Sequence, residues 1–91
     1  MNSILNSEKG ECFLCHRVCR TDKHHIFGAS NRNKSEEYGL FVYLCPDCHT
    51  MAPRAVHRNQ EVMDWLHEIG QEAYEKEYGD DFLQVFGRNY T

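Results

Sequence analysis

The chain has 91 residues, among them five cysteines and six histidines, and its net charge is −4. This length allows one small domain, and 41% apolar with 26% charged residues indicates a folded protein rather than a disordered tail. No apolar stretch reaches the ~18 residues of a membrane span, and residues 1–10 lack the apolar stretch of a signal peptide. We therefore expect a cytoplasmic protein without membrane association.

Charge is distributed unevenly along the chain. Residues 1–58 hold eight Lys/Arg and six Asp/Glu, whereas residues 59–91 hold two and eight. The first part could meet phosphate groups, while the acidic part would face away from a nucleic acid. The net charge by itself therefore does not indicate DNA as a partner.

The first half of the chain predicts two short strands. Residues 1–10 are polar and are expected to form a flexible leader. Residues 11–20 indicate a turn with a short strand, and residues 24–27 continue as a short extended stretch. Residues 28–38 are rich in small polar residues and predict a loop. Residues 40–44 (LFVYL) are β-branched or aromatic and predict a strand.

The second half predicts helices. A short helix follows Pro46, and a long one covers residues 60–78, with Asn59 as its N-cap and Gly79 as its stop. The apolar residues of the long helix recur every three or four positions: Val62, Trp65, Leu66, Ile69, Ala73 and Tyr74. Residues 80–86 predict a last short helix with Phe82, Val85 and Phe86 facing inward. The expected fold class is α+β, a single domain over residues 11–91 with a ββα core to about residue 58 and packing helices from about residue 59.

The cysteines form two C-x-x-C pairs. Cys12 and Cys15 are separated by 29 residues from Cys45 and Cys48. Two such pairs can place four thiolates around one zinc ion, and an odd cysteine count without a secretion signal argues against disulfides. Buried free cysteines or a redox pair would not explain why the motif occurs twice. Cys19 could also chelate with Cys15, but is expected to be a spare, half-buried thiol.

Histidines cluster around these pairs. His24 and His25 are adjacent, and neighbours on a strand point to opposite faces, so one can bind a metal while the other faces a substrate. His49 directly follows the second cysteine pair, and His57 comes eight residues later. His16 and His67 are expected to be ordinary surface residues.

This arrangement resembles the HNH, or ββα-metal, nuclease superfamily. The matching residues are KHHIFG at 23–28, LCPDCH at 44–49 and AVHRN at 55–59. The longer string HHIFGASNRNKSEEYGL, with AVHRN and FGRNY, is also similar to small HNH-like proteins common in bacterial prophages. The resemblance implies a zinc-stapled ββα-metal domain with a short β-hairpin and additional C-terminal helices.

The resemblance also implies an activity, the metal-dependent hydrolysis of DNA phosphodiester bonds. By carry-over, His25 matches the general base, His24 and His49 match ligands of a catalytic divalent ion (Mg²⁺, Mn²⁺, Ni²⁺ or Zn²⁺), and His57 matches the last ligand. The gap before His57 is longer than the family's usual helical turn, so the segment MAPRAV must bulge. No organic cofactor is expected, and cutting both strands of a duplex requires a homodimer or two successive nicks.

The chain departs from the family at one position. The central Asn that orients the general base would fall near Leu40, and Asn31 or Asn33 is the expected substitute. In the same loop, Arg32, Asn33 and Lys34 could contact phosphate groups. Arg54 and Arg58 flank His57 and could lie on the same face.

Two other function classes remain open from the sequence. Leu40 and the acidic C-terminal third favour a zinc-stabilised DNA- or protein-binding module without catalytic activity. An interaction protein that presents its acidic helices as a DNA-like surface is a weaker third hypothesis.

Overall fold

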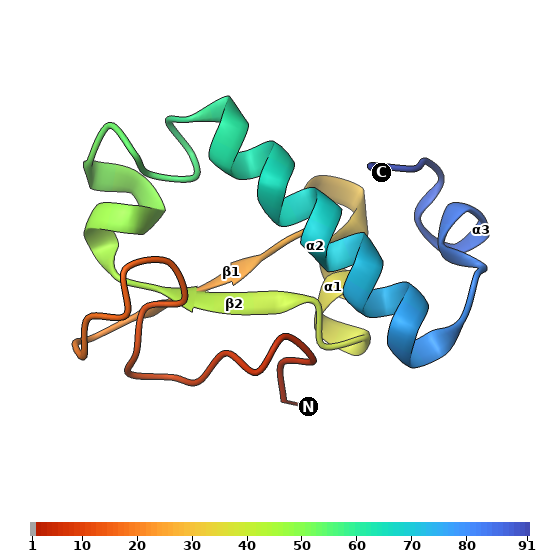
Figure 1. Cartoon of the computed structure of the whole chain (residues 1–91), viewed down its shortest axis with the longest axis horizontal. Coiled ribbons are helices and arrows are strands. Elements are labelled where there is room, and N and C mark those ends of the chain that lie inside the picture. Colours follow the sequence, from red (N-terminus) through yellow and green to blue (C-terminus); the bar gives the residue numbers. More distant parts are fainter. Residues whose placement is uncertain (1) are drawn as a thin grey trace.

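The computed structural model describes residues 2–91, and a two-stranded antiparallel hairpin lies at its centre (Figure 1). β1 (Asp22–His25) pairs with β2 (Phe41–Leu44) in a register that places His24 opposite Val42. Because side chains alternate along a strand, His24 is buried whereas its neighbour His25 is only partly covered. The predicted α+β class with a short hairpin is confirmed.

The connection between the strands is helical, so the predicted loop over residues 28–38 is wrong. It contains a 3-10 turn, η1 (Ala29–Asn31), and a short helix, α1 (Arg32–Glu37). Ser35 explains why this polar segment is ordered. Its buried hydroxyl donates to the carbonyl of Phe27 at 2.7 Å and accepts from the N–H of Phe27 at 3.0 Å. Tertiary anchoring here overrides a weak local propensity.

The later elements follow the predicted order. A π-helical turn, η2 (Asp47–Met51), begins directly after Pro46, and α2 (Gln60–Tyr78) has the predicted bounds. The Asn59 side chain caps α2 by accepting two backbone N–H groups of the first turn, at 3.0 and 3.3 Å. The last helix is α3 (Phe82–Phe86). Within residues 2–91, no helix has the length and apolar character needed to cross a bilayer.

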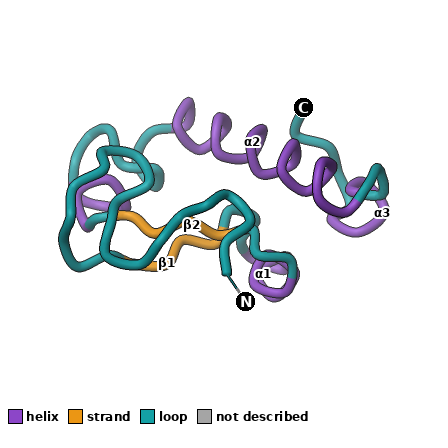
Figure 2. The backbone as a smooth tube through the Cα atoms, turned by 60° about the horizontal axis from the view of Figure 1, so that its bottom comes forward, coloured by secondary structure: helices purple, strands orange, loops and turns teal. Residues whose placement is uncertain are grey.

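α2 runs alongside the hairpin, and α3 lies beside the C-terminal end of α2 (Figures 1 and 2). Both helices contribute residues to the core. The core cluster includes Ile26, Phe27, Leu40, Val42, Leu44, Leu66, Tyr74, Phe82 and Phe86, together with Cys12, Cys45 and Cys48. α2 packs closely against Ile26 and Phe27 at Gly70. A Cβ atom at this position would lie 2.9 Å from the Ile26 side chain and 3.2 Å from the Phe27 ring. Trp65 departs from the predicted inward stripe, because its surface is 47% exposed.

Residues near the N-terminus run beside β2 (Figure 1). Ser3 donates its hydroxyl to the carbonyl of Phe41 at 2.6 Å, and the N–H of Ile4 donates to the carbonyl of Gly39 at 2.9 Å. The Ser7 hydroxyl accepts the N–H of Tyr43 at 2.8 Å. These bonds satisfy the outer edge of β2, so the described part of the expected flexible leader is attached to the sheet.

Candidate metal centres

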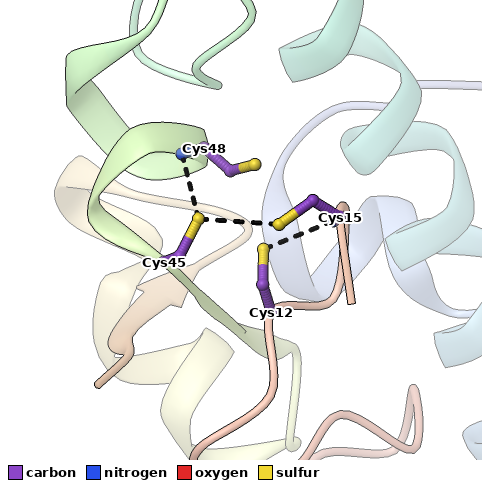
Figure 3. Close-up of side chains that lie close together, drawn as sticks. All are labelled: Cys12, Cys15, Cys45 and Cys48. Atoms are coloured by element: carbon purple, nitrogen blue, oxygen red, sulfur yellow. Dashed lines mark hydrogen bonds between the residues drawn. The ribbon is translucent and has the colours of Figure 1, made fainter. Parts of the chain in front are cut away.

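Four cysteines converge from two segments that are far apart in the sequence (Figure 3). Cys12 and Cys15 lie in the N-terminal turn, which the Glu11–Val18 bridge closes. Cys45 follows β2, and Cys48 lies in η2. The Sγ atoms of all four lie within 4.8 Å of one another, and the cluster could hold a metal ion such as zinc.

The sulfur geometry fits such an ion. Four sulfurs about 2.3 Å from a tetrahedral zinc lie about 3.8 Å apart, and the Sγ atoms of Cys15 and Cys45 are separated by 3.7 Å. In each pair the first sulfur accepts the backbone N–H of the second residue at 3.4 Å, Cys12 from Cys15 and Cys45 from Cys48. Each two-residue spacer therefore turns an amide toward a sulfur.

The local electrostatics differ between the cysteines: burial raises the pKa of Cys48 to about 12, whereas the thiolate is favoured at Cys12. Burial opposes ionisation of Cys12, but the backbone amides of Cys15, Cys45 and Leu14 outweigh it and lower the pKa of Cys12 to about 6. Arg54 is directed to this centre, since contact with the Cys48 sulfur raises the pKa of Arg54. Cys19 lies outside the cluster and is partly buried, as predicted.

Three histidines form a second cluster. His24 comes from β1, His49 from η2 and His57 from the segment between η2 and α2, and their ligand atoms lie within 4.8 Å of one another. The chain between His49 and His57 bulges and then returns, because the N–H of Val56 donates to the carbonyl of Cys48 at 2.8 Å. The N–H of His57 donates to the carbonyl of His49 at 3.3 Å. The eight-residue gap therefore brings His57 back to the other two histidines.

The chemistry of this second cluster fits a divalent ion. The Nε2 atoms of His49 and His57 are 3.1 Å apart, close to the roughly 3.3 Å between two nitrogens bound to one tetrahedral ion at 2.0–2.1 Å. The Nε2 atom of His24 is buried and has no hydrogen-bond partner among the described residues. Burial, followed by His57 and His49, lowers the pKa of His24 to about 3, so this ring is in the neutral form that binds metals.

Further groups surround the histidine cluster. The Oδ2 atom of Asp22 lies 3.4 Å from Nδ1 of His49, a contact that would orient the ring with Nε2 toward an ion. A cavity of about 300 Å³ is lined by Lys23, His24, His25, Gly28, Ala29, Arg32, His49 and His57. The residues expected to bind a metal and the one expected to act as base thus share one cavity.

The prediction that Asn31 orients His25 is wrong. Asn31 donates its side-chain N–H to the carbonyl of Phe86 at 3.1 Å, so it ties η1 to α3 instead of orienting His25. Leu40 is fully buried in the core. The residue that contacts His25 is Glu36, whose Oε1 lies 2.7 Å from Nε2. Sequence reasoning missed Glu36 because its segment was taken for a loop, where no helical face could be assigned.

The residues expected to contact nucleic acid lie in different places. Arg32 and Asn33 are exposed, and Arg32 lines the histidine cavity. Lys34 donates to the carbonyl of Val85 at 2.6 Å, and Arg58 donates to the carbonyl of Met51 at 2.9 Å. Arg54 contacts the cysteine cluster. Of the three arginines expected to contact nucleic acid, Arg32 is therefore the one that lines the histidine cavity.

Fold and site together define a small α+β domain with a four-cysteine centre at one end of its core and a three-histidine centre beside its hairpin. Comparison of the chain with family models, with curated proteins and with solved structures finds no match.

Proposed function

We propose that this protein is a metal-dependent endonuclease of the HNH type that hydrolyses phosphodiester bonds in DNA. The observation that carries the proposal is the buried, unpartnered Nε2 of His24 beside His49 and His57. Burying a polar atom without a partner costs free energy, and a metal ion bound by the three imidazoles would remove that cost. A site with three protein ligands leaves coordination positions for substrate.

The neighbouring residues supply the remaining chemistry of hydrolysis. A divalent ion, when bound, stabilises the negative charge that develops on the phosphoryl group and the leaving oxygen. His25 lines the same cavity and accepts the proton of the attacking water. Arg32 is exposed at the cavity and holds a phosphate oxygen by charge-assisted hydrogen bonds.

A zinc-stabilised binding module without catalytic activity is the alternative. The burial of Leu40 favours it, because no side-chain amide is present at the position where the family places Asn. The exposed acidic residues of α2, among them Glu68, Glu72 and Glu75, also disfavour contact of that face with DNA.

Plasmid cleavage distinguishes the two functions. Protein stripped with EDTA is reloaded with zinc and titrated with magnesium, manganese, nickel or excess zinc. The matched variants are His25→Ala and His16→Ala, since His16 is an exposed histidine that lies outside the cavity. We expect metal-dependent nicking that His25→Ala loses and His16→Ala keeps. Folded, metal-loaded protein that nicks with none of the metals would exclude the nuclease and favour the binding module.

A further inference from the structure

Glu36 occupies a defined position beside His25. Lys23 and His25 are two residues apart on β1, so their side chains lie on the same face of the strand. Glu36, from the last turn of α1, reaches both of them. Its Oε1 is 2.7 Å from Nε2 of His25, and the ammonium of Lys23 donates to both carboxylate oxygens at 3.2 and 3.3 Å.

Packing fixes this group from several sides. The Lys23 ammonium also lies 4.3 Å from the centre of the Phe41 ring. The His25 ring meets the same ring edge-on, with 6.2 Å between ring centres, and its side chain is 13% exposed. The buried Ser35 hydroxyl, one residue before Glu36, anchors α1 to the backbone of Phe27. Packing therefore holds the His25 ring, while the Glu36 side chain, which is 45% exposed, is held by its bonds to His25 and Lys23.

The charge of Glu36 decides which nitrogen of His25 carries the proton. Hydrogen bonds from His25 and Lys23 lower the pKa of Glu36, so its carboxylate is ionised at neutral pH and can only accept hydrogen bonds. The Nε2 atom of His25 must then be the donor. In the neutral ring this leaves the lone pair on Nδ1, which has no hydrogen-bond partner within residues 2–91.

We propose that Glu36 is a positioning residue that holds His25 with its proton on Nε2 and thereby leaves Nδ1 free to accept the proton of the attacking water. This inference rests on the proposed nuclease function, and it assigns to a helical carboxylate the orienting role that the central Asn has in the family. A buried or partly buried carboxylate that fixes the tautomer of a catalytic imidazole is an established device in enzymes.

The test combines a spectroscopic readout with kinetics. The tautomer of His25 is measured by long-range ¹H–¹⁵N NMR on zinc-loaded protein at mildly alkaline pH, with His25→Gln used to assign its signals. The variants are Glu36→Gln, Glu36→Ala and the matched control Glu37→Gln, which changes the neighbouring, exposed carboxylate of α1. The same proteins are assayed for cleavage with the most active metal, and kcat and KM are determined separately.

We expect wild type and Glu37→Gln to carry the proton on Nε2, and both Glu36 variants to shift toward the Nδ1–H form. Cleavage by the Glu36 variants should fall on the order of 10- to 100-fold in kcat, with KM changed by less than about twofold and metal content unchanged. A purely structural role would lower the melting temperature or the metal content instead, and circular dichroism with metal analysis measures both.

Three results would overturn the inference in distinguishable ways. A wild-type His25 with its proton on Nδ1 excludes the positioning by Glu36, whatever the activity. Unchanged kcat in both Glu36 variants, where His25→Ala abolishes cleavage, excludes a role of this contact in catalysis. If the wild-type protein shows no cleavage with any of the metals, the proposed function itself is overturned. The NMR measurement then still decides whether Glu36 sets the tautomer.

Discussion

The cysteine and histidine centres are built differently although they share a backbone segment. Three of the four cysteines are buried in the core cluster, whereas His24 is buried, His49 partly covered and His57 exposed at an open cavity. Closed sites with four protein ligands are typical of structural metals, and sites with three ligands and an open position are typical of catalytic ones. Under the proposed function, this difference in burial would correspond to a structural cysteine centre and a histidine centre that meets substrate.

The shared segment is η2. It holds Cys48 and His49 side by side, and the backbone hydrogen bonds from Val56 and His57 return to the carbonyls of these two residues. A metal ion held by the four cysteines would fix η2 against the N-terminal turn. We therefore expect the histidine centre to depend on the cysteine centre, but not the reverse.

Cys48→Ser should have the largest effect. Structural zinc contributes roughly 10–16 kcal/mol in zinc-finger peptides, which is as large as the whole stability of an ordinary domain. The variant should lose its native circular dichroism and bind metal at neither centre, as measured by native mass spectrometry. Cys19→Ser is the control and should keep the fold and both sites. A folded Cys48→Ser protein with metal at the histidine centre would contradict the dependence.

Leu40→Asn tests whether an Asn at the position where the HNH resemblance expects one supports cleavage. Leu40 is fully buried, so the change removes apolar volume and buries an amide without an assigned partner. We expect a loss of about 3–5 kcal/mol in the free energy of unfolding, measured by urea denaturation, and no gain in cleavage. Leu83→Asn, at an exposed position of α3, should change stability by less than about 0.5 kcal/mol. Increased cleavage by Leu40→Asn would show that Glu36 is an inadequate substitute.

His57→Ala should abolish metal binding at the histidine centre without affecting the cysteine centre. Its side chain is exposed, so the fold and the metal at the cysteines should persist while the second metal is lost. In wild type, excess divalent metal at about 100 times its Kd should add about 2.7 kcal/mol of stability, and the variant should lack this increment. Thermal unfolding with and without added metal measures it. Two metals per chain in the variant would remove His57 from the ligand set.

The smallest effect should be the pH dependence of stability between pH 7 and pH 5.5, on the order of 1 kcal/mol. In protein without metal at the histidine centre, the pKa of His24 is about 3 in the folded state and near 6.5 when unfolded. The unfolded chain binds the extra proton below pH 6.5, so stability is complete above that pH and falls by up to about 1.4 kcal/mol per pH unit toward pH 3.

The reference for this measurement is His24→Gln, which lacks the titrating ring but keeps the cysteine centre. The difference between the two proteins in urea denaturation from pH 7 to pH 5.5 isolates the contribution of His24. Parallel curves for wild type and His24→Gln would show that His24 is accessible to protons in the folded state.

Local sequence patterns predicted the elements whose signals are local. The apolar spacing, the Asn59 cap and the stop at Gly79 gave the bounds of α2, because a helix depends on neighbours three and four residues apart. The strand at residues 41–44 followed from its β-branched and aromatic residues. The repeated C-x-x-C spacing predicted that four cysteines meet, since each pair already converges within one turn.

The sequence by itself thus determined an α+β domain with a predicted four-cysteine centre, and it identified the histidines that gather beside the hairpin. Only the tertiary structure decided what surrounds them. In the folded chain, the buried Ser35 anchors α1, and Glu36 contacts His25. Asn31 bonds to α3, and Arg54 contacts the cysteine centre. These contacts join residues whose side-chain directions depend on how separate elements pack, and residue type and spacing do not encode that packing locally.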